Sequence, residues 1–291
     1  MRVLFRADSS SKIGTGHIRR SLVLASRLDE SEIFFATKSL EGDINNIIPY
    51  PVFTLETSSI DELIKLIKEL NIDKLIIDHY EIGFDDEKKI KEALPNLRVL
   101  VFDDLYEKHY CDVLLNHNIY AKKSAYEGLV PEHCELRCGV LYTLIRSEFR
   151  DEKKRKREKI YDVFIAIGGA DIKNITPKII ENLPKKLKIC VATTSSNPNI
   201  AKLQKLEREN LNLKIDDKKI EKLLNESKFA IISPSGLVHE ALFMEVPFLA
   251  IKVAKNQRLM YEYLIENEYM AMKEWDEELF LDFKRKIWKD L

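Results

Sequence analysis

Short apolar runs, each about as long as one strand, alternate with amphipathic helical patterns along most of the chain. The apolar runs of the first half lie at residues 3–7, 33–36, 52–55, 75–78, 99–102 and 113–115. Between them, residues 18–28 and 60–70 repeat leucine and isoleucine at the three- and four-residue spacing of a helix with one buried face. Strands that alternate with helices predict parallel βαβ units and a doubly wound α/β sheet.

A highly charged segment at residues 150–159 interrupts this alternation. No aromatic residues are interspersed in it, so the segment predicts a solvated linker rather than a nucleic-acid-binding stretch. Beyond it, apolar runs at residues 163–167, 189–192, 211–215, 229–232 and 248–253 again alternate with helical patterns. We therefore predict two Rossmann-like domains with a ligand cleft between them, at residues 1–149 and 150–275. A C-terminal helix at residues 276–291 is expected to pack back toward the first domain.

The charge balance and the apolar runs exclude several classes of partner. Lys and Arg number 47 against 48 Asp and Glu, a net charge of −1, which gives no general attraction to nucleic acid or to an acidic membrane. No apolar run is long enough to span a bilayer, and the chain starts directly with a strand-like segment rather than a signal peptide. The four cysteines are scattered, which predicts reduced thiols in a cytoplasmic protein.

Glycine is scarce but clustered. The chain has only 9 glycines, about half of the usual share of roughly 7%. Five of them lie in three short stretches that each follow a predicted strand: Gly14 and Gly16, Gly168 and Gly169, and Gly236. Such clustering predicts tight loops at which the backbone approaches a ligand closely.

The first stretch, Gly14-Thr15-Gly16-His17, fits neither common phosphate-binding pattern. A dinucleotide site needs a third glycine where Arg19 stands and an acid after the second strand, where Thr37-Lys38 stands. A P-loop needs Gly-Lys-Ser/Thr, which is absent. His17 enters the first turn of a predicted helix, whose positive end favours a neutral imidazole able to act as a general base. The alternative is a surface histidine at a helix start.

The other two stretches predict anion sites. Small residues after a strand, as at Gly168-Gly169 and Ser235-Gly236, suit an approaching phosphate at a helix N-terminus. Asn174 is expected either to cap the following helix or to offer its amide to a ligand. Glu240 lies one turn past Gly236, where its carboxylate is placed to accept both hydroxyls of a ribose. A plain tight turn and a solvated glutamate remain the alternatives.

These three stretches, in this order, resemble the GT-B superfamily of nucleotide-sugar enzymes. Gly14–His17 is similar to the glycine-histidine loop of the lipid-II-forming N-acetylglucosaminyltransferase, and Ser235–Glu240, Val246-Pro247 and Asn256-Gln257 are similar to its nucleotide-binding half. More closely, the chain resembles the family of UDP-sugar hydrolases of pseudaminic acid biosynthesis. The motifs behind that resemblance are Arg6-Ala7-Asp8, residues 14–19, 77–80 and 102–104, Gly168–Asn174 and Ser235–Glu240.

The resemblance implies hydrolysis of UDP-2,4-diacetamido-2,4,6-trideoxy-β-L-altropyranose to UDP and the free sugar, without a metal ion or another cofactor. His17 would activate a water that attacks the anomeric carbon with inversion, breaking the C–O bond. UDP is already a good leaving group, so the paired carboxylates of a glycosidase are not required. The remaining residues expected to contact the substrate are Gly14, Gly16, Asp78, Tyr80, Gly168, Gly169, Asn174, Ser235, Gly236, Glu240, Asn256 and Gln257.

Within this set the expected contacts differ. Asp78 and Tyr80 would face the sugar, with Tyr80 preferred to His79 because its side chain reaches further. Gly168, Gly169, Asn174 and the Ser235-Gly236 helix start would hold the diphosphate. Glu240 would bind the ribose, and Asn256 or Gln257 would reach the sugar or its phosphate.

Three alternatives remain open. A metal-dependent pyrophosphatase would use carboxylates and imidazoles from a set of six residues: Asp78, His79, Asp103, Asp104, His109 and His117. A glycosyltransferase or a UDP-sugar 2-epimerase would share the architecture, although the chain is short for a transferase and lacks a membrane-binding patch. A nucleotide-sugar sensor without turnover is the non-enzymatic alternative.

Overall fold

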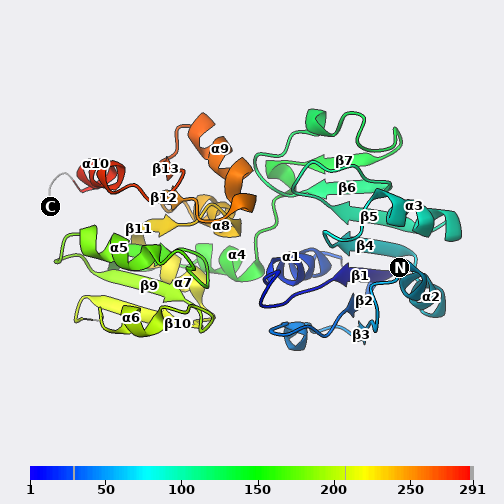
Figure 1. Ribbon diagram of the computed structural model, residues 1–291, viewed down its shortest axis with the longest axis horizontal. Coiled ribbons are helices and arrows are strands. Elements are labelled where there is room, and N and C mark those ends of the chain that lie inside the picture. The colour runs from blue at the N-terminus through cyan, green and yellow to red at the C-terminus, as the bar shows by residue number, and fades with distance from the viewer. Residues whose placement is uncertain (29, 207, 289–291) are drawn as a thin grey trace. The chain divides into compact units, whose positions relative to one another are not determined.

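The computed structural model describes residues 1–28, 30–206 and 208–288. The chain divides into two compact units, Met1–Leu144 and Ile145–Leu291, each with its own parallel sheet (Figure 1). This division falls close to the predicted border at residues 149 and 150. The predicted border itself lies inside the helix α4 (Ser147–Lys153), which occupies the first part of the charged segment.

The first unit contains a seven-stranded sheet in the order β3-β2-β1-β4-β5-β6-β7, in which every pairing is parallel. Its strands are β1 (Arg2–Ala7), β2 (Glu32–Thr37), β3 (Val52–Thr54), β4 (Lys74–Asp78), β5 (Arg98–Phe102), β6 (Val113–Asn116) and β7 (Glu135–Cys138). Its helices are α1 (Gly16–Ala25), α2 (Ile60–Glu69) and α3 (Phe84–Ala93), with short 3-10 turns at Asn45–Ile47, Lys123–Tyr126 and Val140–Tyr142.

Side chains of successive strand residues point to opposite faces, so each strand of this sheet feeds two cores. In β1, Leu4 packs with α2 and α3 on one face, whereas Phe5 packs with α1 on the other. Helix α2 forms where the sequence predicted it: Ser59 accepts a hydrogen bond from the backbone N–H of Asp61, and the apolar side of the helix is buried.

The second unit repeats the plan with six parallel strands in the order β10-β9-β8-β11-β12-β13 (Figure 1). Its strands are β8 (Tyr161–Ala166), β9 (Ile189–Thr193), β10 (Leu211–Ile215), β11 (Ser227–Ile232), β12 (Phe248–Ile251) and β13 (Ala271–Met272). Its helices are α4, α5 (Ile175–Asn182), α6 (Ile200–Gln204), α7 (Ile220–Asn225), α8 (Gly236–Phe243), α9 (Arg258–Glu266) and α10 (Glu277–Ile287). The prediction of two doubly wound α/β units is confirmed.

In both units the strand order reverses beside the first strand, between β1 and β4 and between β8 and β11. Ligands of open α/β sheets bind beyond the carboxyl ends of the strands at such a reversal. The register pairs Ala7 with Asp78 in the first unit and Ala166 with Ile232 in the second. All three glycine stretches therefore follow strands that meet at a reversal point.

The C-terminal helix α10 packs on the core of its own unit. Phe280 is only 1% exposed, and the ring of Trp288 meets the ring of Phe229 edge-on at 5.5 Å. The apolar side of this helix was expected to pack toward the first domain, and it packs on the core of the second unit instead. The last part of that predicted helix, residues 289–291, lies outside the described residues.

Across the described part of the chain, none of the helices combines the length and the apolar character needed to cross a membrane.

The packing of α10 predicts unequal effects for two adjacent apolar residues. Phe280→Ala removes a fully buried ring and is expected to cost about 3–5 kcal/mol of unfolding free energy. Leu279→Ala, at a side chain that is 38% exposed, is the matched control, with an expected loss of about 1 kcal/mol or less. Urea unfolding followed by circular dichroism measures both, and equal losses would contradict this packing.

Candidate active site

His17 and Asp78 form a buried pair at the reversal point of the first sheet. His17 lies in the first turn of α1 and Asp78 ends β4; their exposed fractions are 6% and 1%. The Nδ1 atom of His17 is 2.6 Å from Oδ1 of Asp78. Because the carboxylate can only accept, Nδ1 carries the proton, and Nε2 is left with a lone pair that can take a proton from water.

The loop that leads to His17 is a tight turn closed on itself. Ser10 and Gly14 exchange two backbone hydrogen bonds of 3.2 and 2.9 Å, and Gly14 has φ of +81°, a conformation that favours glycine. Gly14 and Gly16 are exposed, and Gly16 is the first residue of α1. Both predicted glycines therefore shape the approach to His17.

Arg20, one turn after His17 on α1, binds the same carboxylate. Its Nε and NH2 atoms each donate to Asp78 at 2.6 Å, and its NH1 donates to Asp104 at 2.7 Å. Burial alone would raise the pKa of Asp78, but the charge and the hydrogen bonds of Arg20, with the hydrogen bond of His17, hold that pKa far below its usual range. Asp78 is therefore ionised at neutral pH.

Asp78 was predicted to contact the sugar, but its side chain is enclosed by two other residues of the protein. Both of its oxygens are taken by Arg20 and His17, and almost none of the side chain is exposed. The Asp78 carboxylate therefore presents almost no surface to a ligand, and its contact with the sugar stays a prediction.

Tyr80 lies beside this pair and is half exposed. Its ring meets the His17 ring edge-on at 4.6 Å, and its hydroxyl is 3.1 Å from both carboxylate oxygens of Asp104. Burial and the negative charge of Asp104 hold the pKa of Tyr80 well above its usual range, so the hydroxyl stays protonated. Of the two predicted sugar-facing residues, Tyr80 is the one with a side chain open to a ligand.

His79 belongs to a second ion cluster. Arg6 donates to both oxygens of the buried Asp8, at 2.6 and 2.8 Å, and Nε2 of His79 is 3.0 Å from the same carboxylate. The backbone N–H of Glu81 donates to Nδ1 of His79, so Nε2 carries the proton and Asp8 accepts it. Both ring nitrogens are thus occupied.

The segment after β5, which carries Asp104, is fastened by Asp103. The Asp103 carboxylate accepts backbone N–H groups of Leu105 and Tyr106 at 3.0 and 2.8 Å, and the Tyr126 hydroxyl at 2.5 Å. This is the turn-capping role that competed with the metal-ligand prediction. Among the described residues, no three or more His, Cys, Asp or Glu side chains are grouped so as to hold a metal ion.

Further along this segment, His109 is buried between two carboxylates. Its Nδ1 is 2.7 Å from Glu87 on α3, and its Nε2 is 3.7 Å from Asp103. Burial alone would lower the pKa of His109, but the nearby carboxylates of Asp103 and Glu87 raise it to about 9. An imidazolium therefore links α3 to the segment that carries Asp104.

In the second unit, Gly168 and Gly169 follow β8 and are exposed. The Gly169 carbonyl accepts hydrogen bonds from the hydroxyl group of Thr193 and from that of Thr194. A Cβ atom at Gly169 would stand 3.0 Å from the Thr194 side chain. Only glycine fits this close approach without displacing its neighbour.

The helix start after these glycines is capped by Asp171 and not by Asn174. The Asp171 carboxylate accepts the backbone N–H groups of Ile175 and Thr176, both at 2.9 Å. Asn174 has φ of +52°, and its side chain makes no capping hydrogen bond. Of the two predicted uses of Asn174, the offer of its amide to a ligand is the one compatible with this geometry.

The start of α8, unlike the start of α5, has no side chain among the described residues that caps its backbone N–H groups. Its N-cap residue, Ser235, makes no side-chain capping bond, and both Ser235 and Gly236 are exposed. No acidic residue lies in the first turn. Backbone N–H groups at such a helix start attract an anion.

Glu240, one turn into α8, is 6% exposed and held by Arg146. Arg146 donates from Nε and NH2 to the two carboxylate oxygens at 2.6 and 3.0 Å. Burial alone would lower the pKa of Arg146, but the Glu240 carboxylate raises it.

Asn256 and Gln257 lie together in a 3-10 turn before α9. The Gln257 side-chain oxygen accepts the backbone N–H groups of Val253 and Ala254 at 2.8 and 3.2 Å, so it shapes this turn. Asn256 is exposed, which makes it the better placed of the two for ligand contact.

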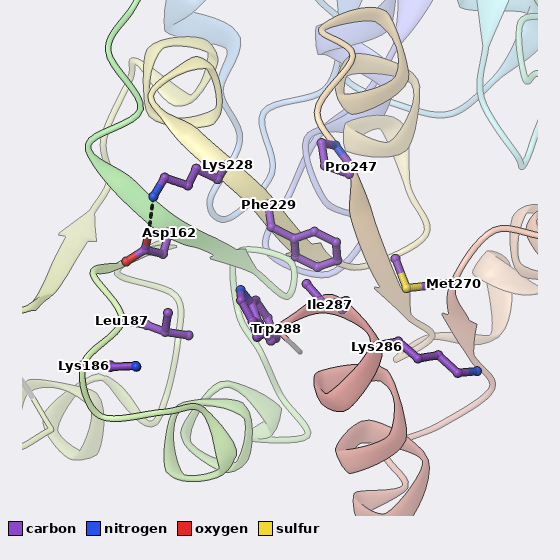
Figure 2. Close-up of a pocket in the computed structure, with 10 residues that line it drawn as sticks. All are labelled: Asp162, Lys186, Leu187, Lys228, Phe229, Pro247, Met270, Lys286, Ile287 and Trp288. Atoms are coloured by element: carbon purple, nitrogen blue, oxygen red, sulfur yellow. Dashed lines mark hydrogen bonds and ion pairs between the residues drawn. The ribbon is translucent and has the colours of Figure 1, made fainter. Parts of the chain in front are cut away.

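A cavity of about 620 Å³ lies at the other edge of the second sheet, where the strands begin (Figure 2). Its apolar floor includes Phe229 and Trp288, and Lys228 at its rim pairs with Asp162 at 2.8 Å. It contains none of the residues predicted for ligand binding.

Arg20 and Arg146 were missed by the sequence analysis. Arg20 stands three residues after His17, a spacing that places both on one side of a helix. This was the signal available for Arg20. No sequence signal was available for Arg146, because its partner Glu240 is 94 residues away.

Comparison with solved structures assigns the fold to the GT-B class. MurG of Acinetobacter baumannii has a TM-score of 0.65 at 12% identity, covering 98% of this chain and 90% of that one. Anabaena HepE, solved with UDP and glucose, has a TM-score of 0.64 at 12% identity, covering 100% and 90%. The fold is thus that of two-domain glycosyltransferases, as predicted. Comparison with protein-family models finds no match.

Sequence comparison is more specific. The chain is 53% identical over 271 residues to the UDP-2,4-diacetamido-2,4,6-trideoxy-β-L-altropyranose hydrolase of Campylobacter jejuni, covering 92% of this chain and 98% of that one. It is also 26% identical to an uncharacterized protein of Methanocaldococcus jannaschii, over 90% of this chain and 58% of that protein. The chain belongs to the family of the Campylobacter jejuni UDP-sugar hydrolase.

The His109 cluster predicts how stability depends on pH. The pKa of His109 is raised on folding from 6.5 to about 9, so its stabilisation is complete below pH 6.5 and is lost as the pH rises through 9. His109→Gln should therefore lower the unfolding free energy at pH 6.5 and much less at pH 10. Urea unfolding of both proteins at several pH values measures the difference, and a difference that does not change with pH would contradict the assignment.

Proposed function

We propose that the chain hydrolyses UDP-2,4-diacetamido-2,4,6-trideoxy-β-L-altropyranose to UDP and the free sugar, as a cytoplasmic step of pseudaminic acid biosynthesis. The supporting observation is that a chain 53% identical to a hydrolase of that name has a buried histidine–carboxylate pair at the reversal point of its first sheet. Open α/β sheets generally bind ligands at such a point. The four cysteines are free thiols, which fits the cytoplasm.

In this proposal His17 is the general base. Asp78 holds the Nδ1 proton, so the Nε2 lone pair is free to remove a proton from water as that water attacks the anomeric carbon. The ionised Asp78 also stabilises the imidazolium that forms, as the buried aspartate does in a serine-protease triad. Attack on the face opposite the leaving UDP inverts the anomeric configuration. Tyr80, adjacent to the imidazole, contacts the sugar.

The second unit binds the leaving group. Gly168, Gly169 and the open start of α8, at Ser235 and Gly236, surround the diphosphate with backbone N–H groups, and Asn174 adds its amide. These dipoles stabilise the charge that develops as the C–O bond breaks. Glu240, held by Arg146, accepts the ribose hydroxyls, and Asn256 contacts the sugar or its phosphate.

Replacement of the base tests this proposal. His17→Asn should lower kcat by about 10²–10⁴-fold, the usual contribution of a general base, while UDP binds as before because its contacts lie in the second unit. His133→Asn, at a side chain that is 59% exposed, is the matched control and should keep full activity. Turnover of the UDP-sugar and calorimetric titration with UDP are the measurements. Unchanged turnover by His17→Asn would refute the assignment of the base.

A further inference from the structure

The Arg20 side chain donates hydrogen bonds to two carboxylates, Asp78 and Asp104. Asp78 is also bonded to His17, and Asp104 is also bonded to Tyr80. The three guanidinium nitrogens of Arg20 all have carboxylate acceptors within 2.7 Å: Nε and NH2 bind Asp78, and NH1 binds Asp104. The guanidinium also lies over the Phe102 ring, with 5.4 Å between its carbon and the ring centre. Its side chain is 15% exposed, so solvent has little access to these bonds.

The order of the contacts gives a continuous chain of hydrogen bonds. It runs from the half-exposed Tyr80 hydroxyl to Asp104, from there through Arg20 to Asp78, and ends at Nδ1 of His17. His17 and Arg20 come from α1, Asp78 ends β4, and Tyr80 and Asp104 lie in the segments that follow β4 and β5. The ring contact between Tyr80 and His17 closes the chain into a loop.

We propose that Arg20 is a positioning residue for the reaction, which fixes the proton of His17 through Asp78 and the direction of the Tyr80 hydroxyl through Asp104. This inference rests on the proposed function. Arg20 itself touches neither water nor sugar in this role; it sets how two other side chains meet them.

The first effect follows from charge. Asp78 is almost fully buried, and a buried carboxylate without a cation beside it takes up a proton or draws a proton from its neighbour. With Arg20 in place, Asp78 stays ionised although His17 is neutral. NH2 of Arg20 also lies 3.2 Å from Nδ1 of His17, and both groups share the same Asp78 oxygen.

The second effect follows from direction. The Asp104 oxygens accept from Arg20 and from Tyr80, so the Tyr80 proton points at Asp104. The hydroxyl then has only lone pairs to offer to a ligand. Tyr80 would therefore accept a hydrogen bond from an N–H or O–H group of the sugar, and an acetamido N–H is such a donor.

Lysine cannot replace Arg20 in this geometry. The planar fork of arginine reaches two carboxylates with three nitrogens, whereas an ammonium group is a single point on a flexible stem. Arg20→Lys keeps the positive charge but loses the simultaneous contacts. Arg20→Gln loses the charge as well, so the pair of variants separates the two effects.

The expected results differ for the two variants. Arg20→Lys should lower kcat about 10- to 100-fold, the scale of a small misplacement of a catalytic group, with KM and UDP binding within about threefold. Arg20→Gln should in addition move the acidic limb of the pH profile of kcat upward by about one unit, because Asp78 then faces His17 without a counter-ion. The other titratable groups around this cluster are Asp104, Tyr80 and the Asp8–His79 pair, all present in both variants.

Arg27→Lys is the matched control, since Arg27 follows the same helix, is exposed, and donates to the Thr143 carbonyl at 3.4 Å. Its kcat and pH profile should not change. Circular dichroism checks that each variant folds. If His17→Asn is inactive while both Arg20 variants keep kcat and the pH profile, the positioning role is refuted and the proposed function stands. If His17→Asn is fully active, the assignment of His17 as the base fails, and the positioning role of Arg20 fails with it; if the unmodified protein does not hydrolyse the UDP-sugar, the proposed function itself fails.

Discussion

The first unit depends on one carboxylate, Asp78, placed between an imidazole and a guanidinium. Sheet topology puts it there: β4 lies beside β1 at the reversal of strand order, so the end of β4 meets the loop and helix that follow β1. Burial makes this charge costly unless it is paired. His17 and Arg20 supply the pairing from successive turns of α1, and this fixes both ring orientation and the site of the proton.

The second unit repeats the topology with the opposite chemistry. The loops after β8 and β11 present glycine backbone and an uncapped helix start instead of enclosed ion pairs. Asp171 occupies the start of α5, which leaves the start of α8 and the glycines as the places for an anion. In the proposed function, one fold used twice thus provides a base in one unit and an electropositive backbone surface in the other.

Much of the fold could be predicted because buried parallel strands are continuous apolar runs. Helix α3 and strand β7 were not singled out. Helix α3 is dominated by charged residues, with Ile90 as its one buried apolar side chain, and β7 is a partly exposed edge strand.

His17 and the glycine loops were visible as local motifs. The contacts of Asp78 were not visible, because they join residues 58 and 61 positions apart, and only the strand order shows that these residues meet. The capping of α5 by Asp171 was equally hidden, since Asn174 is the nearer candidate by sequence.

The central claim is that water, activated at His17, attacks the anomeric carbon. Hydrolysis of the UDP-sugar in ¹⁸O-labelled water, analysed by mass spectrometry with and without EDTA, tests it most directly. The account predicts one ¹⁸O atom in the released sugar, none in UDP, and the same rate with EDTA. Label in UDP or UMP, or a rate abolished by EDTA, would show that a P–O bond is cleaved or that a metal ion is needed, and would contradict the account.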